Sequence, residues 1–199
     1  MHVGTSAPRH HVRRDHGAVQ RVSVVGISGS GKTTLGRRLA PALGVAHVEL
    51  DAIFHQSGWT ELPPEDFRRR VGAVLEADGW VVDGNYGAVR DLVWAAADTV
   101  VWMDRPRATV MRRVVGRTVR RAVTRQELWN GNREPLGGMF RRDPRDNLVL
   151  WTWTNHTRYA ERYATASVDP ANAHLTFVRV TDDADGDRLV ALARASAAR

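Results

Sequence analysis

The sequence predicts an α/β domain in which a parallel sheet is flanked by helices. Five short apolar runs suited to buried strands alternate with segments whose apolar residues recur every three or four positions. Four of these runs end at a glycine or an aspartate, namely Gly26, Asp51, Asp83 and Asp104. Ligands of parallel sheets bind beyond the carboxyl ends of the strands. We therefore expect these residues to mark the edge that carries a binding site.

The predicted elements begin at residue 21 and continue to the end of the chain. Strands are predicted over residues 21–27, 46–51, 80–83, 99–103 and 175–180. Helices are predicted over residues 32–43, 65–77, 88–97, 108–123, 148–163 and 183–198. Glycine or proline stands at several boundaries, as at Gly44, Pro64 and Pro106. Residues 127–143 are polar and glycine-rich, which favours a long loop.

Length and composition favour one globular domain over residues 21–199, preceded by a basic tail over residues 1–20 that we expect to be disordered. The chain has 199 residues, of which 43% are hydrophobic, and it has no cysteine. Disulfide frameworks and thiolate metal sites are therefore excluded. No apolar run approaches the roughly 18 residues of a membrane span, and the tail lacks the apolar core of a secretory signal. We expect a cytoplasmic protein.

Positive charge is concentrated in residues 105–145, which contain twelve arginines and three acids, whereas the net charge of the whole chain is +7. A block of this kind needs an anionic partner. Two partners fit: the phosphates of a small ligand, or nucleic acid.

Residues 26–33, Gly-Ile-Ser-Gly-Ser-Gly-Lys-Thr, match the G-x-x-x-x-G-K-[ST] motif of a P-loop (Walker A). The motif lies between a predicted strand and a predicted helix, as a phosphate-binding loop requires. Lys32 is the only lysine among 29 basic residues, which indicates a position where a planar guanidinium does not replace a compact ammonium. We expect Lys32 to contact the β- and γ-phosphates of ATP. The predicted nucleotide-binding residues are Gly26, Ser28, Gly29, Ser30, Gly31, Lys32, Thr33 and Thr34.

Two acids at strand ends are candidates for the chemistry. We expect Thr33 and Asp83 to hold Mg²⁺, because Asp83 follows an apolar strand as the acid of a Walker B segment does. The alternative for Asp83 is an ordinary Asp-Gly turn. Asp51 has two open interpretations: it orients or deprotonates the hydroxyl of an acceptor, or it caps a following turn. We interpret Glu49 as a solvated or packing residue and Asp104 as a strand-end turn acid.

Four arginines share one face of the helix predicted over residues 108–123, namely Arg113, Arg117, Arg120 and Arg121. No acid stands among them, which favours a functional role over a solvated face. They resemble the lid arginines of adenylate-kinase-like proteins, which close over phosphates, and this resemblance implies Arg113 and Arg117 as the catalytic arginines. A solvated charged face is the alternative. Trp59 and Trp129 lie in glycine-flanked loops, where each could stack on an acceptor or pack beneath the lid. No two histidines outside the tail stand at a sequence spacing typical of metal ligands.

Several segments together resemble the topology-modulation-protein group, P-loop proteins similar to adenylate kinase. They are the P-loop with the Thr-Leu that follows it, His-Val-Glu-Leu-Asp at 47–51, Gly-Trp at 58–59, Trp-Val-Val-Asp-Gly-Asn-Tyr at 80–86, Val-Arg-Asp at 89–91 and Leu-Trp-Asn-Gly-Asn-Arg-Glu at 128–134. The resemblance implies a nucleoside-kinase-like core with a five-stranded sheet and a mobile arginine-rich lid over about 112–145. It also implies acceptor contacts for Arg90 and Arg133. Departures from adenylate kinase, such as the Asp-Gly-Asn-Tyr segment, place AMP in doubt as the acceptor.

The sequence thus predicts a P-loop NTPase fold and an ATP-dependent kinase that transfers the γ-phosphate of Mg·ATP to a small acceptor such as a nucleotide or nucleoside, which Asp51, Arg90 and Arg133 bind. Two alternatives stay open. The first is a nucleotide-dependent regulatory ATPase without a small-molecule acceptor. The second is a nucleic-acid-binding module that uses the 105–145 block, although no nucleic-acid-binding fold is recognisable.

Overall fold

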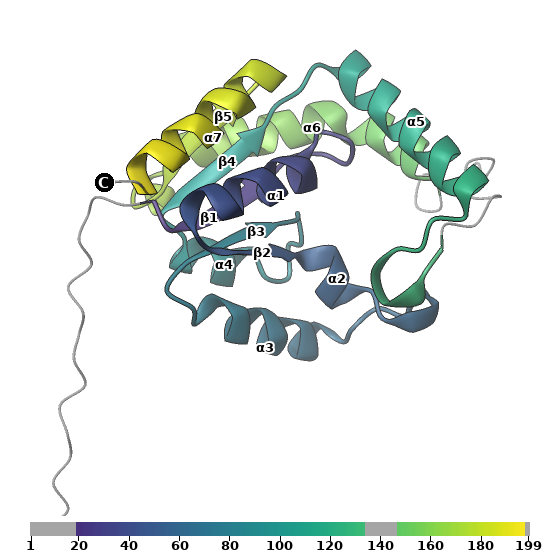
Figure 1. Cartoon of the computed structure of the whole chain (residues 1–199), viewed down its shortest axis with the longest axis horizontal. Coiled ribbons are helices and arrows are strands. Elements are labelled where there is room, and N and C mark those ends of the chain that lie inside the picture. Colours follow the sequence, from purple (N-terminus) through teal and green to yellow (C-terminus); the bar gives the residue numbers. More distant parts are fainter. Residues whose placement is uncertain (1–18, 134–146, 198–199) are drawn as a thin grey trace, which may run out of the picture.

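Five parallel strands form the sheet at the centre of the molecule, in the order β2-β3-β1-β4-β5 (Figure 1). The computed structural model describes residues 19–133 and 147–197. The strands are β1 (Arg21–Val25), β2 (Ala46–Glu49), β3 (Trp80–Asp83), β4 (Thr99–Met103) and β5 (Thr176–Val180). The predicted five-stranded parallel sheet is therefore confirmed. Most of the predicted tail and residues 134–146 of the predicted lid and loop lie outside the described residues.

Helices cover both faces of the sheet. They are α1 (Lys32–Leu43), α2 (Leu50–Phe54), α3 (Pro64–Leu75), α4 (Arg90–Ala96), α5 (Arg107–Thr124), α6 (Leu148–Val168) and α7 (Asp183–Ala197). Short 3₁₀ turns stand at Ser57–Trp59, Trp129–Gly131 and Pro170–Asn172. Helices α1 and α7 pack on one face, and α3, α4 and α6 pack on the other. None of these helices combines the length and apolar character needed to cross a membrane.

Two apolar layers hold the sheet between its helices. Leu35 and Leu39 of α1 pack with Val190 of α7 on one face. Phe67 of α3 and Tyr163 of α6 belong to the layer on the other face. A third, smaller cluster fixes α5, because Val110 and Val114 are fully buried against Ile27 of the P-loop. The arginine-bearing helix is thus packed directly on the phosphate-binding loop.

The second strand is shorter than predicted. Glu49 pairs with Asp83, the last residue of β3, and the chain then turns into α2. Asp51 therefore lies in the first turn of a helix and not at a strand end, and the cap position belongs to Glu49. Both the predicted strand boundary and the capping interpretation of Asp51 are wrong. A carboxylate in the first turn is favoured there by the partial positive charge of the helix N-terminus.

Candidate functional site

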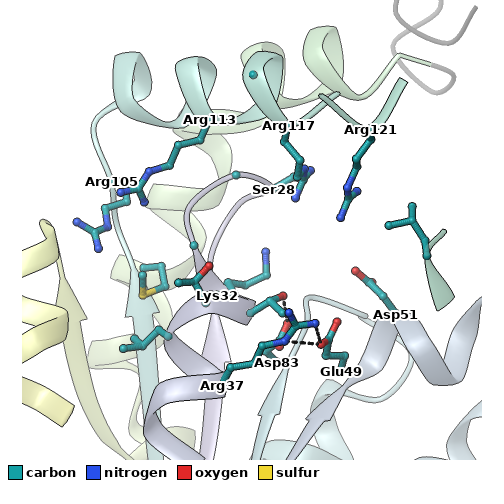
Figure 2. Close-up of a pocket in the computed structure, with 18 of the residues that line it drawn as sticks. Ser28, Lys32, Arg37, Glu49, Asp51, Asp83, Arg105, Arg113, Arg117 and Arg121 are labelled. Carbon is teal, nitrogen blue, oxygen red and sulfur yellow. Dashed lines mark hydrogen bonds and ion pairs between the residues drawn. The ribbon is translucent and has the colours of Figure 1, made fainter. Parts of the chain in front are cut away.

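A cavity of about 890 Å³ opens at the carboxyl ends of the strands, between the P-loop and α5 (Figure 2). Its walls include most of the residues for which the sequence predicted a role: Ser28, Gly29, Gly31, Lys32, Thr33, Thr34, Asp51, Asp83, Arg113, Arg117, Arg120 and Arg121. Glu49, Arg37, Arg105, Trp129 and Asp183 also line it. The predicted elements of a phosphate site therefore meet in one place.

Two glycines let the P-loop fit between β4 and α5. Gly26 has φ +143°, and a Cβ built on it would lie 2.7 Å from the carbonyl oxygen of Met103. Gly29 has φ +80°, and its Cβ would overlap the side chain of Val114 on α5. Since α1 begins at Lys32 without a side-chain cap, the first backbone N–H groups of the helix are free to bind an anion. The loop is shaped for phosphate.

Lys32 is half-buried and lines the cavity from below, as Figure 2 shows. Its Nζ donates a hydrogen bond to the carbonyl oxygen of Ile27 at 3.1 Å. Burial lowers the pKa of Lys32, while the negative charges of Asp83 and Asp51 oppose that effect. An ammonium at this place balances the negative charges of the two acids.

Asp83 is held at both of its carboxylate oxygens. The Thr33 hydroxyl donates to Oδ1 at 3.1 Å, and Nε2 of His47 lies 2.7 Å from Oδ2. The Asp83 side chain is only 4% exposed. Thr33 and Asp83 thus stand together beneath the P-loop, and their role as Mg²⁺ ligands stays a prediction. The sequence interpretation assigned no role to His47.

Asn85, in the Asp-Gly-Asn-Tyr segment, tethers the first residue of the P-loop. The backbone N–H of Gly26 donates to Asn85 Oδ1 at 3.1 Å, and Asn85 Nδ2 donates back to the Gly26 carbonyl. The Tyr163 hydroxyl also donates to Asn85 Oδ1, at 3.0 Å. In the sequence, Asn85 stands out only as part of the Asp-Gly-Asn-Tyr segment, and nothing local to it indicates a contact with the P-loop.

The arginines of α5 extend from the helix toward the P-loop (Figure 2). Arg113 donates to the Ser30 carbonyl at 3.3 Å and to both carboxylate oxygens of Asp183, at 3.0 and 2.9 Å. Arg117 donates to the Ser28 hydroxyl at 2.9 Å. Arg105, which is buried, also pairs with Asp183 at 2.9 Å. Hydrogen bonding to Arg113 is the main cause that lowers the pKa of Asp183. A concentrated cationic wall therefore faces the loop.

The opposite wall carries acids and aromatic side chains. The Tyr86 hydroxyl donates to Asp51 Oδ1 at 2.6 Å and lies 3.4 Å from Nε2 of His55. Burial is the main cause that raises the pKa of Tyr86, and the charge of Asp51 adds to it. The phenol therefore stays protonated and keeps donating to Asp51. This contact fixes the orientation of the acid that the sequence predicted for the acceptor.

Glu49 is part of this wall and not a solvated side chain. Burial favours a higher pKa for Glu49, but hydrogen bonds from Arg37 and Trp129 outweigh it and the pKa is lowered. Arg37 Nε donates at 3.1 Å, and the indole Nε1 of Trp129 donates at 2.9 Å. Trp129 thus holds a carboxylate through its N–H. The sequence interpretation of Glu49 missed this role because Trp129 is distant in the chain.

Two loops, which we call the clamp loops (residues 55–60 and 127–133), are bonded to each other, and the second lines the cavity with Glu127, Leu128 and Trp129. Asn132 Oδ1 accepts from the Trp59 backbone N–H at 2.8 Å, and Asn132 Nδ2 donates to the Gln56 carbonyl at 2.8 Å. Nε1 of Trp59 donates to the Arg133 carbonyl at 3.1 Å. Residues 127–133 of the predicted lid are therefore tied to the chain that follows Asp51.

Four predicted site residues do not line the open cavity, namely Gly26, Ser30, Arg90 and Arg133. The Arg90 guanidinium lies 5.8 Å from the ring centre of Trp94, beside a separate small hollow. Arg133 pairs with Glu127 at 3.8 Å and is mostly exposed. The Ser30 hydroxyl is buried within the P-loop and has no hydrogen-bond partner in the described part of the chain.

Comparison with known proteins finds relatives that are named as shikimate kinases. No family model matches it. A shikimate kinase of Mycobacterium ulcerans is 36% identical over 111 residues, which are 49% of this chain and 60% of that protein. A shikimate kinase of Synechococcus elongatus is 30% identical over 132 residues, which are 56% of this chain and 70% of that protein. The chain thus spans about 60% of the length of the Mycobacterium relative it matches.

Solved structures agree on the fold. The shikimate kinase of Bacteroides thetaiotaomicron superimposes with a TM-score of 0.51 at 17% identity, covering 88% of this chain and 96% of that one. This likeness supports the predicted P-loop NTPase α/β fold. The family follows from the sequence match: because the chain covers 70% of the Synechococcus protein at 30% identity, it belongs to the shikimate kinase family.

Proposed function

We propose that the protein transfers the γ-phosphoryl group of Mg·ATP to a hydroxyl of a small acceptor. One observation carries the proposal: the P-loop, the arginines of α5 and the acid Asp51 all line a single cavity. The relatives named as shikimate kinases support a phosphoryl acceptor of low molecular mass. The finer kinship with the topology-modulation group, and a nucleotide or nucleoside as acceptor, remain part of the proposal and have yet to be tested.

The P-loop binds the triphosphate in this proposal. Its backbone N–H groups and the N-terminus of α1 surround the phosphate oxygens, and Lys32 contacts the β- and γ-phosphates. Arg113 already donates to the carbonyl oxygen of Ser30, and Arg117 already donates to the hydroxyl of Ser28. The same two guanidinium groups can therefore stabilise charge that develops on the transferring phosphoryl group.

The residues around Thr33 fit a magnesium ion. Mg²⁺ prefers oxygen ligands and commonly uses one or two protein side chains together with substrate phosphates. Thr33 and Asp83 supply such oxygens, and within residues 19–133 and 147–197 no group of three or more His, Asp or Glu forms a competing metal cage. When bound, Mg²⁺ would neutralise charge on the β- and γ-phosphates.

Asp51 is the proposed base for the acceptor. As the acceptor oxygen forms its bond to the γ-phosphorus, the bond from that phosphorus to the β,γ-bridging oxygen breaks and ADP leaves. The hydroxyl proton passes to the Asp51 carboxylate, whose other contact, from Tyr86, holds it in place. The acceptor contacts implied for Arg90 and Arg133 stay predictions. An Arg90→Ala variant with unchanged acceptor KM would remove the first of them.

A coupled ADP-release assay tests the proposal. Mg·ATP is offered with shikimate, nucleosides, nucleoside monophosphates and small hydroxy acids, with Lys32→Ala as the inactive control. One acceptor should raise ADP release above the rate without acceptor, and the phosphorylated acceptor should be found by mass spectrometry. If ATP binds but free phosphate appears at the same rate with every acceptor, the regulatory ATPase takes the place of the kinase.

The arrangement of the arginines bears on the nucleic-acid alternative. Arg113, Arg117, Arg120 and Arg121 line the cavity, and Arg105 is buried against Asp183. These side chains therefore face a concave site of small-ligand size and not an open groove for a polymer. We accordingly favour the phosphates of a small ligand as the anionic partner of the 105–145 block.

A further inference from the structure

His47 stands between the sheet and α1, on the face where the P-loop helix packs. His47 of β2 and Asp83 of β3 are diagonal neighbours on the same face, because the register pairs His47 with Val81 and Glu49 with Asp83. Nε2 of His47 lies 2.7 Å from Asp83 Oδ2. An ionised carboxylate only accepts hydrogen bonds, so this contact requires a hydrogen on Nε2. His47 is therefore a donor to the acid beneath the P-loop.

The two oxygens of Asp83 have different donors. Thr33 of α1 takes Oδ1, and His47 of β2 takes Oδ2. The terminal torsion of an aspartate is broad when nothing constrains it. Donors on both oxygens, from two separate elements, fix the plane of the carboxylate. With side-chain exposures of 14% for His47 and 4% for Asp83, solvent competes little for the contact.

Helix α1 provides a space that only glycine leaves open. Gly36 is buried one turn after Thr33, and a Cβ built on it would lie 2.5 Å from Nε2 and 2.8 Å from Cδ2 of His47. The imidazole thus rests directly on the helix backbone. Any side chain at position 36 would displace the ring that holds Asp83. Gly36, His47 and Asp83 therefore form one fitted unit.

We propose that His47 is a positioning residue, which orients Asp83 for the magnesium ion of the nucleotide. This inference rests on the proposed function, in which Thr33 and Asp83 hold the metal. Hydrogen bonds behind a metal-binding carboxylate orient it, and their removal typically lowers metal affinity about 10–100-fold. His47 acts through Asp83 and touches neither nucleotide nor acceptor. A histidine that only fills the core would affect folding and leave the metal dependence unchanged.

Four variants distinguish a histidine that positions Asp83 from one that only fills the core. His47→Leu removes the donor, and His47→Gln keeps an N–H at a similar distance from the backbone. Gly36→Ala leaves His47 in the sequence but crowds its ring. Gly72→Ala is the matched control, because Gly72 also lies inside a helix and a Cβ there meets nothing within 4 Å. Both glycine variants share the same gain in helix propensity.

The measurement is ATP binding by calorimetry in the presence of Mg²⁺ and in its absence, alongside unfolding in urea. We expect His47→Leu and Gly36→Ala to bind metal-free ATP within about twofold of the parent, and to lose about tenfold or more of the enhancement by Mg²⁺. His47→Gln should recover most of the enhancement, and Gly72→Ala should match the parent protein.

The outcomes distinguish a failure of the role of His47 from a failure of the proposed function on which that role rests. If the parent protein shows no enhancement by Mg²⁺, the metal site of the proposed function fails, and the role of His47 fails with it. If the parent shows the enhancement and both His47→Leu and Gly36→Ala retain it, only the role of His47 is overturned. If His47→Leu does not fold, Gly36→Ala against Gly72→Ala decides the question alone.

Discussion

The floor of the cavity, formed by the P-loop with the ends of β1 and β3, and its roof, formed by α5 and the clamp loops, are fixed by different contacts. The floor depends on backbone conformation, with left-handed glycines at 29 and 31 and a helix that begins at Lys32. The roof depends on side chains that reach across the cavity, such as Arg113 to Asp183 and Arg117 to Ser28.

The floor is therefore preformed, whereas a ligand can replace the contacts that hold the roof. Backbone N–H groups of the floor keep their direction whether or not phosphate is bound. The guanidinium groups of the roof are bonded to the loop itself, so phosphate oxygens would compete with Ser28 and Ser30 for the same donors. We therefore expect floor variants to impair nucleotide binding and roof variants to impair mainly the transfer step.

Lys32→Ala is the change with the largest expected effect. It removes the only lysine, whose ammonium lines the cavity and contacts the β- and γ-phosphates in the proposed function. We expect acceptor-dependent ADP release to fall about 10²–10³-fold, the range found when one charge-stabilising donor is deleted. Lys32→Arg is the control and should not restore the rate, because a planar guanidinium does not fit the place of an ammonium. A fully active Lys32→Arg would contradict the argument from lysine usage.

Arg117→Ala tests the roof. Because Arg117 contacts the hydroxyl of Ser28 in the absence of phosphate, we expect kcat to fall at least tenfold while the Kd for ATP changes by less than about threefold. Arg158→Ala, an exposed arginine on α6, is the matched control and should leave both constants unchanged. Equal losses in kcat and ATP affinity would show that the roof binds the ground state as strongly as the floor does.

Sequence patterns revealed the floor well because its geometry is local. The motif at 26–33 and the apolar runs at 80–83 and 99–103 specify their structures within a few residues, and the structure confirms each element. Thr33 and Asp83 were assigned to one site from the Walker A and Walker B patterns alone, and the structure brings them together because β1 and β3 are adjacent strands.

Side chains that act across long stretches of chain were harder to predict. Glu49 was assigned no role in the site, yet it is bonded by Trp129, 80 residues away, and Asn85 bonds Gly26 over 59 residues. Asp51 was placed at a strand end because the apolar pattern continues to Leu50, whereas the ladder stops where β3 stops. Periodicity indicates which residues are buried. It does not indicate at which residue the pairing with a neighbouring strand stops, or which distant side chain forms a hydrogen bond with a polar group.

Asn132→Ala tests whether the clamp loops hold the roof. Asn132 is 3% exposed and its side chain makes two hydrogen bonds, to residues 56 and 59, so we expect the free energy of unfolding to drop by about 1–3 kcal/mol. The KM for the acceptor should rise, with ATP affinity unchanged. Asn155→Ala is the matched control, because its amide bonds only residues of its own helix. An unaltered acceptor KM in Asn132→Ala would separate the clamp loops from the acceptor site.

Asp91→Asn, outside both regions, has the smallest expected effect and sets the baseline for ionic contacts in this protein. Hydrogen bonds from Arg68 lower the pKa of Asp91 from 3.8 to about 2. A lowered folded-state pKa stabilises the fold above the unfolded value, and that contribution is lost as pH falls through the folded value. The stability difference between parent and variant should therefore be constant near neutral pH and vanish below about pH 2.

The measurement for Asp91 is urea unfolding across that range, together with the carboxyl ¹³C titration of Asp91 by NMR. Both groups are substantially exposed, with 39% of the Arg68 side chain and 63% of the Asp91 side chain accessible, so water and salt screen the pair and the difference should be small. Added salt should reduce it further, since exposed charges are screened within a Debye length. A titration midpoint near the ordinary aspartate value would mean that the Arg68 contact does not persist in solution. In that case the exposed ion pairs of the roof, such as Arg113 with Asp183, should be equally easy for phosphate to displace.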